Sequence, residues 1–290
     1  MNRLMLCCFP SILVSLAARY LWTPASVRKD SSYGWFGAYD GNVIGGLLVG
    51  FGMSVSGACP GTVLVQVANG SRSGVFAALG CLLGGALFVA FSPVLKRMAA
   101  SQVVDQMHTV QKRFRFSTRA VLLGFEALCL AVLGLSSLST NTNSTTRHWL
   151  SPILGGVLIG LAQALSILLT RKTIGVSTAW EDAGRYIHSW KGVGAADCPR
   201  TLRTPSILFA AGVLSGSLIV AHFLPLAMYA SAQLSPVAAV LGGVSMVFGA
   251  RLAGGCTSGH GISGMASFSI SSFITVASMF SGGILTAMVL

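Results

Sequence analysis

Charged side chains are scarce in this sequence. Asp, Glu, Lys and Arg together make up 9% of the 290 residues, and only 7 residues are acidic. Soluble globular domains carry about 25% charged residues, so this composition lies far outside their range. Hydrophobic residues instead reach 53%, and the mean hydropathy is +0.75. The scarcity of charge therefore excludes a soluble globular domain and predicts an all-α polytopic protein in a lipid bilayer.

Several functional motifs are also missing. The 7 cysteines form no CxxC pair and mostly lie in apolar runs, so a disulfide framework is not expected. No GxxxxGK[ST] loop is present, which argues against ATP-driven transport by this chain alone. The net charge of +12 arises from basic residues in loops between apolar runs, so lipid headgroups explain it better than nucleic acid. No cofactor is expected.

Apolar runs of about 20 residues, enough to cross about 30 Å of hydrocarbon as a helix, recur along the chain. They predict spans near residues 4–22, 74–95, 120–138, 149–169, 207–230 and 270–290. Two further stretches, 43–57 and 236–253, are too short or too glycine-rich for ordinary spans. Each runs into a glycine-flanked cysteine. We expect both to be helices that stop inside the membrane, where non-helical backbone is tolerated only beside protein or a polar cavity.

Basic residues predict the topology. They crowd the loops 96–119 and 171–203, which should both face the cytoplasm, and the plasma membrane is the expected location. The segment between these loops should then face outside. It carries the glycosylation sequon Asn143-Ser144-Thr145, which is consistent with that side.

A repeat relates the two halves of the chain. Residues 45–61 align with 242–258 at a constant separation of 197, which superposes several glycines and places Cys59 on Cys256. An embedded cysteine in the same register makes coincidence less plausible than matched glycines alone. Duplicated halves with paired broken segments indicate a transporter site near the bilayer midplane.

The repeat also predicts the organisation of one integral membrane domain. After one inserted residue, the glycine pair 84–85 superposes on 282–283. The expected parts are an N-terminal membrane segment and loop (1–42), a first repeat (43–138) and a second repeat (139–290). The stretch 151–182 in the second repeat has no counterpart in the first. We therefore expect either a first repeat that lost its leading segments or a chain that is an incomplete version of a longer protein.

Three segments carry a resemblance to a known family: "GFGMSVSGACPGTVLVQVANG", "RKTIGVSTAWE" and "GARLAGGCTSGHGISGM". They resemble the YeeE/YedE family of membrane proteins, whose characterised members take up thiosulfate, and its fungal branch in particular. The resemblance covers residues 43–290. It implies two pseudo-symmetric halves with short re-entrant helices that meet at a narrow central passage, lined by Cys59 and Cys256 as substrate-binding thiols. The family also uses a cysteine in an early helix of the first half, and no motif here matches it.

The residue types suit an anion in such a passage. A re-entrant helix directs unpaired N–H groups and the positive end of its dipole toward the passage. Glycines allow tight turns and close backbone approach, hydroxyls add donors, and a neutral thiol can touch a terminal sulfur without holding it hard. Arg251 lies near enough in sequence to help attract the anion. Besides the two cysteines, the candidate site residues are Gly57, Gly61, Gly254, Gly255, Thr257, Ser258, His260, Gly175 and Ser177.

Each assignment has a plainer alternative. Cys59 and Cys256 could instead be small buried apolar residues with a packing role. We assign that role to Cys81 and Cys129. His260 could pair with Cys256 on a metal, but two ligands make a poor site, so turn geometry or a hydrogen bond to substrate is favoured and no metal is expected.

Two further features remain open. Glu126 lies in an apolar run and is either a carrier of a coupling proton or a residue that pairs helices. The segment "TIGVSTAWED" is either an ordinary cytoplasmic turn or a second re-entrant element. The glycines at 84, 85, 155, 156 and 160 are expected to serve close helix packing.

Three functions remain. The leading one is a permease for thiosulfate or a related small inorganic sulfur anion, with no enzymatic activity. The second is a membrane sulfurtransferase that forms a cysteine persulfide and hands its sulfur to a cytoplasmic acceptor protein. The third is a truncated family member that keeps the fold but does not transport.

Overall fold

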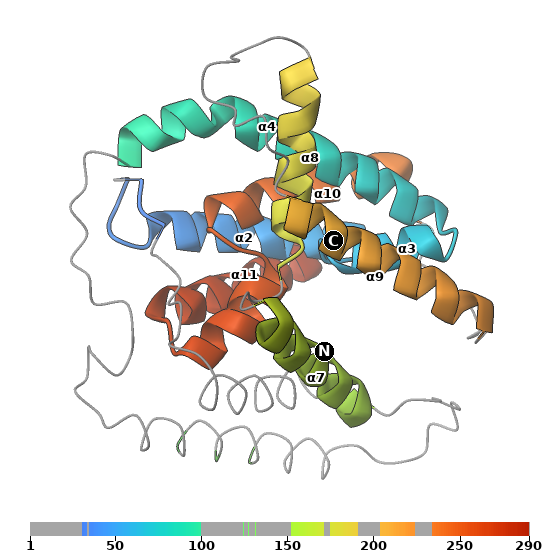
Figure 1. Cartoon of the computed structure of the whole chain (residues 1–290). Helices are drawn as coiled ribbons and strands as arrows, with labels where there is room; N and C mark the ends of the chain where they lie inside the picture. The colour runs from blue at the N-terminus through green and yellow to red at the C-terminus, as the bar shows by residue number, and fades with distance from the viewer. Residues whose placement is uncertain are drawn as a thin grey trace. The chain divides into compact units, whose positions relative to one another are not determined.

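The computed structural model describes residues 31–33, 35–99, 152–170, 175–190, 204–223 and 234–289, together with positions 124, 127 and 131. Every regular element over these ranges is a helix, which confirms the all-α prediction for this part of the chain (Figure 1). The chain divides into two compact units. Among the described residues, the smaller unit holds α7 (Pro152–Thr170) and residues 261–273, and the larger holds the other α-helices, including most of α11.

Within the described residues, three helices are long and apolar enough to cross a membrane. They lie at Arg72–Leu95, Ser206–Phe223 and Ile270–Val289. These belong to α4 (Arg72–Ala99), α9 (Thr204–Phe223) and α11 (Ile270–Val289). They confirm that the predicted spans at 74–95, 207–230 and 270–290 are apolar helices of spanning length, although the described part of the second ends at Phe223. The predicted spans at 4–22 and 120–138 lie wholly or largely outside the described residues, as does Glu126.

The two short apolar stretches form α2 (Asp40–Ser56) and α10 (Pro236–Leu252), each of 17 residues. The start of α10 follows from its sequence, because the Ser235 hydroxyl accepts from Ala238 N at 3.2 Å and Pro236 occupies the first helical position. The end of α2 is set by Gly57, which is left-handed (φ 62) and donates its N–H to Met53 O at 2.9 Å.

Glycines bring α2 and α10 into backbone contact. A Cβ added at Gly45 would lie 2.6 Å from Gly249 O, and one added at Gly52 would lie 2.5 Å from Gly242 O. The far atom is backbone in both cases and cannot swing aside. Small residues at these positions therefore allow the close helix approach that is common in membrane proteins.

Glycine also allows each of these two helices to pack closely against a spanning helix. Gly84 of α4 faces Val244 O of α10, which would lie 2.6 Å from an added Cβ. Gly282 of α11 faces Leu47 O of α2, which would lie 2.5 Å away. The prediction that Gly84 serves helix packing is therefore confirmed.

The other packing glycines give a mixed result. Gly85 faces Trp180 O at 2.4 Å from an added Cβ, which confirms the prediction at this position. At Gly155 an added Cβ would meet no atom of the described residues within 4 Å, so close packing at this position stays a prediction. Gly156 and Gly160 are buried.

The region 171–203, predicted as a cytoplasmic loop, contains α8 (Ser177–Trp190). One face of α8 is buried and carries Trp180 and Glu181, whereas Tyr186 on the other face is 60% exposed. The helix packs against α4, α9 and α10 in the larger unit (Figure 1). The charges in this region thus belong in part to a packed amphipathic helix.

Candidate functional site

Cys59 lies in the turn between α2 and α3 (Thr62–Ala68) and is half-buried. The N–H and the hydroxyl of Thr62 each lie 3.4 Å from Cys59 Sγ, and Cys59 N donates to Thr62 Oγ1 at 2.7 Å. These bonds fix the thiol at the beginning of α3. Cys81, by contrast, is fully buried in an apolar cluster with Val63 and Ala77, as its interpretation as a packing residue predicts. Cys129 lies outside the described residues.

Cys256 follows α10 and is buried, with 1% of its surface exposed. Its Sγ lies 3.2 Å from the Ser258 hydroxyl. The hydroxyl and the backbone N–H of Ser177 and the backbone N–H of Gly259 also lie close to the sulfur. Because Ser177 is the first residue of α8, the sulfur lies at the positive end of that helix. Such donors stabilise negative charge at this position.

The beginning of α8 contacts both cysteine turns. Trp180 Nε1 donates to Pro60 O at 3.0 Å, beside Cys59. A Cβ added at Gly61 would touch a methyl group of Val176 at 3.6 Å. Ser177, which lies between Val176 and Trp180 in the sequence, is close to Cys256 Sγ. The structure therefore places two predicted site residues, Cys59 and Cys256, near the beginning of α8, which carries the third, Ser177. Trp180 was not predicted as a site residue, because in the sequence its indole resembles an ordinary apolar side chain.

The predicted turn glycines differ in their roles. Gly57 and Gly254 are left-handed, with φ of 62 and 80, and this conformation favours glycine. Gly255 donates its N–H to Ala250 O at 2.8 Å within the turn that ends α10. Gly61 has φ −82, which any residue adopts, so the tight-turn explanation is wrong there.

Two other predicted residues shape the turns near Cys256. His260 is fully buried, and its Nε2 lies 3.0 Å from Ala253 O, to which it donates, since a carbonyl only accepts. The Asn42 amide donates to the same carbonyl at 3.2 Å. His260 therefore supports the turn geometry at the end of α10. Thr257 is half-buried directly after Cys256.

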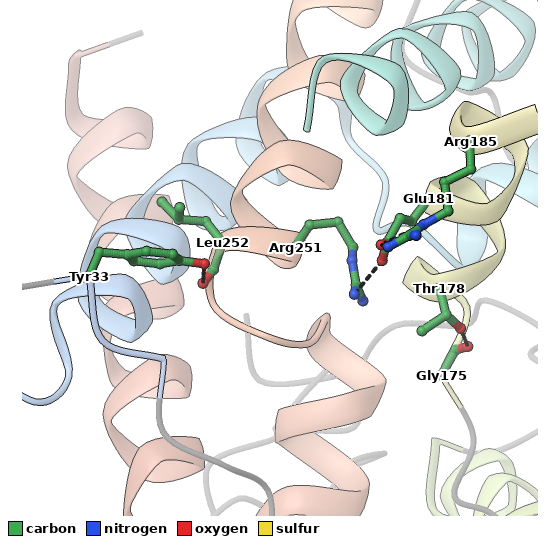
Figure 2. Close-up of polar contacts among 7 residues, drawn as sticks. All are labelled: Tyr33, Gly175, Thr178, Glu181, Arg185, Arg251 and Leu252. Atoms are coloured by element: carbon green, nitrogen blue, oxygen red, sulfur yellow. Dashed lines mark hydrogen bonds and ion pairs between the residues drawn. The ribbon is translucent and has the colours of Figure 1, made fainter. Parts of the chain in front are cut away.

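Further side chains cap the end of α10 (Figure 2). The Leu252 carbonyl accepts from the Ser31 hydroxyl at 2.5 Å and from the Tyr33 phenol at 3.3 Å. Burial raises the pKa of the Tyr33 phenol above its ordinary value of 10.0, so the phenol keeps the proton that it donates. At the start of α8, Thr178 Oγ1 donates to Gly175 O at 3.0 Å, which places Gly175 in the turn before Ser177.

A buried ion pair lies beside the site. Arg251, in the last turn of α10, pairs with Glu181 of α8, and Arg185 pairs with the same carboxylate (Figure 2). The Arg251 guanidinium also lies over the Phe88 ring, 5.8 Å from its centroid. The expectation that Arg251 attracts the anion did not include this carboxylate, which balances its charge. No local pattern in the sequence predicts that Glu181 faces Arg251.

Comparison with known proteins gives two results. The family described as "Sulphur transport" matches residues 3–285 of this chain. A protein of Xylella fastidiosa (strain 9a5c) named "Probable transporter" is 30% identical over 142 residues, which cover 49% of this chain and 94% of that protein. A protein of the same name from X. fastidiosa (strain Temecula1) is 29% identical over 142 residues, with the same coverage.

Proposed function

The chain belongs to the sulphur-transport family, and from this premise we propose that it carries thiosulfate, or a closely related small sulfur anion, across the membrane past Cys59 and Cys256. Family membership and the "Probable transporter" relatives support a transporter of sulfur compounds rather than an enzyme.

The observation that carries the proposal is the set of donors around Cys256 Sγ. Hydroxyls of Ser177 and Ser258 and backbone N–H groups of Ser177 and Gly259 converge on this sulfur at the beginning of α8. The same groups are suited to the oxygens of an anion that takes up a place beside the thiol. Neutral donors without a full cation at the sulfur hold a divalent anion weakly enough to release it.

Helix contacts support the proposed repeat. Gly45 corresponds to Gly242, and Gly52 to Gly249, at a separation of 197 positions. The contact of Gly45 with Gly249 is therefore equivalent to the contact of Gly242 with Gly52, and the structure contains both. A hydrogen bond of 2.9 Å from the Ser245 hydroxyl to Leu48 O joins two residues with that same separation. A set of contacts that maps onto itself in this way is typical of a two-fold relation between α2 and α10.

The spanning helices follow the same relation. Gly46 of α2 faces Thr275 O of α11, 2.8 Å from an added Cβ, and Gly243 of α10 faces Ala77 O of α4 at 2.4 Å. The helix pairs α2–α11 and α10–α4 thus pack through equivalent positions. We accordingly assign residues 43–138 and 139–290 to the two repeats.

The inserted residue of the second repeat falls near Cys256. Gly57 and Gly254 share a left-handed conformation at a separation of 197, and Gly70 (φ 71) and Phe268 (φ 52) share one at 198. Between them the first half forms the α-helix α3, whereas the second forms the π-helix η1 (Ser258–Gly264). A π-helical turn accommodates one additional residue, and such turns occur often at functional sites.

The lengths of α2 and α10 support a re-entrant arrangement. A helix of 17 residues rises about 26 Å at about 1.5 Å per residue, which is less than the roughly 30 Å of a hydrocarbon core. We propose that both helices end at a passage within the membrane, and that the cysteine turns and the beginning of α8 line it.

The test of the substrate is growth of a cell that lacks its own thiosulfate uptake and receives thiosulfate as its only sulfur source. Expression of the chain should restore growth, whereas an empty vector should not. Sulfate in place of thiosulfate should give no such dependence on the chain. Failure to restore growth, with the chain folded in the membrane, would contradict thiosulfate as the substrate.

A further inference from the structure

The buried carboxylate of Glu181 lies one helical turn after Ser177 on α8. Its side chain is 8% exposed and pairs with Arg251 of α10 and Arg185 of α8 (Figure 2). Residues four positions apart lie on one face of a helix, so Ser177 and Glu181 face the same neighbour. That neighbour is the end of α10 and the turn that carries Cys256.

The pair with Arg251 connects two elements, whereas the pair with Arg185 does not. The Arg251 side chain is 17% exposed and its guanidinium is held over the Phe88 ring of α4. Arg185 lies four residues after Glu181 on the same helix and is 34% exposed. Loss of Arg185 therefore leaves the ion pair between α8 and α10 in place, while loss of the Glu181 charge removes that ion pair and leaves Arg251 without its counter-ion.

We propose that Glu181 is a positioning residue: through its ion pair with Arg251 it holds Ser177 against Cys256 and so keeps the thiol enclosed by its donors. This inference rests on the proposed function for its significance in transport, but the enclosure of the thiol is testable by itself. Glu181 does not touch the sulfur and acts only through the placement of α8.

The test measures alkylation of individual cysteines by iodoacetamide in the full chain in membranes, with each modified cysteine quantified by mass spectrometry. Cys81, fully buried in α4, reports unfolding in the same sample. We expect Glu181→Gln to raise the rate of alkylation at Cys256 by about fivefold, which is the size of effect expected from one lost hydrogen bond, without alkylation at Cys81. The control Arg185→Gln should change the rate at Cys256 by less than about twofold.

A double substitution tests whether Glu181 protects Cys256 through Ser177. If Glu181 acts through Ser177, then Ser177→Ala combined with Glu181→Gln should raise alkylation no further than the larger single effect. Glu181→Asp, which keeps the charge, should restore most of the protection. In uptake assays Glu181→Gln should raise KM for thiosulfate more than it lowers the maximal rate.

Three results would overturn the inference. They are unchanged alkylation at Cys256 in Glu181→Gln, equal increases at Cys256 and Cys81, and effects of Ser177→Ala and Glu181→Gln that multiply. If the native chain carries no thiosulfate, the proposed function fails, while the alkylation results still decide whether Glu181 positions Ser177.

Discussion

Ser177, the first residue of α8, lies beside Cys256 Sγ with both its hydroxyl and its backbone N–H, so the beginning of α8 meets the turn after α10. A serine and a cysteine that were both predicted as site residues are thus neighbours. The turn at Cys59 and the turn at Cys256, which are far apart in the sequence, thus both lie beside the segment that begins at Gly175 and leads into α8.

Removal of the Ser177 hydroxyl should weaken the site directly. We expect Ser177→Ala to raise KM for thiosulfate by about fivefold, because one donor to the sulfur and its bound anion is lost while the backbone N–H remains. Ser215→Ala is a matched control, since its hydroxyl is exposed on α9 and bonds only to Gly212 O, at 3.2 Å. Initial uptake rates over a range of thiosulfate concentrations measure the effect. An unchanged KM would contradict a role for this donor.

The left-handed glycines should resist substitution. We expect Gly57→Ala and Gly254→Ala to lower stability by about 1 kcal/mol each, because a Cβ disfavours their positive φ. Gly212→Ala, in α9, should not destabilise, since an added Cβ meets nothing within 4 Å. Thermal unfolding of the detergent-purified chain measures all three. Equal melting temperatures would indicate that these turns relax freely.

The contact between α2 and α10 gives a sterically stricter prediction. Gly52→Ala would place a Cβ 2.5 Å from Gly242 O, so we expect a loss of about 1–3 kcal/mol from overpacking and a lower yield of folded protein. Gly216→Ala is the control, because its position in α9 is open. Size-exclusion profiles and melting temperatures would show the difference. Native-like behaviour of Gly52→Ala would contradict the close approach of these helices.

Trp180 should anchor the turn at Cys59. Trp180→Phe keeps an aromatic ring but removes the Nε1 donor to Pro60 O, which leaves a buried carbonyl unsatisfied at a cost of about 1–3 kcal/mol. We expect a lower melting temperature and faster alkylation at Cys59, with Cys81 still protected. If alkylation at Cys59 were unchanged, the indole would serve packing alone.

Much of the helix arrangement was predictable because it depends on residue type at fixed separation. Four of the glycines that align between the two halves, Gly45, Gly52, Gly242 and Gly249, bring α2 and α10 into contact, since only glycine permits that approach. The cysteine register was likewise visible in the sequence. Gly61 was misjudged because a glycine in a turn does not by itself reveal its φ.

The role of α8 was harder to predict for a different reason. Its charges lie in a basic stretch that resembles a cytoplasmic loop, and the pairing of Glu181 with Arg251 depends on which face of α8 meets α10. That is a tertiary relation with no local signature. The π-helix also escaped prediction, because the inserted residue could have been taken up anywhere between Cys256 and Gly282.

The most direct test of the paired-thiol passage is the initial rate of radiolabelled thiosulfate uptake by the native chain and its Cys59→Ala, Cys256→Ala and Cys81→Ala forms at equal membrane levels. The account predicts that uptake falls at least about tenfold in the first two variants and stays within about twofold of native in the third, because only the first two thiols lie in the proposed passage. Native uptake in both Cys59→Ala and Cys256→Ala would contradict it.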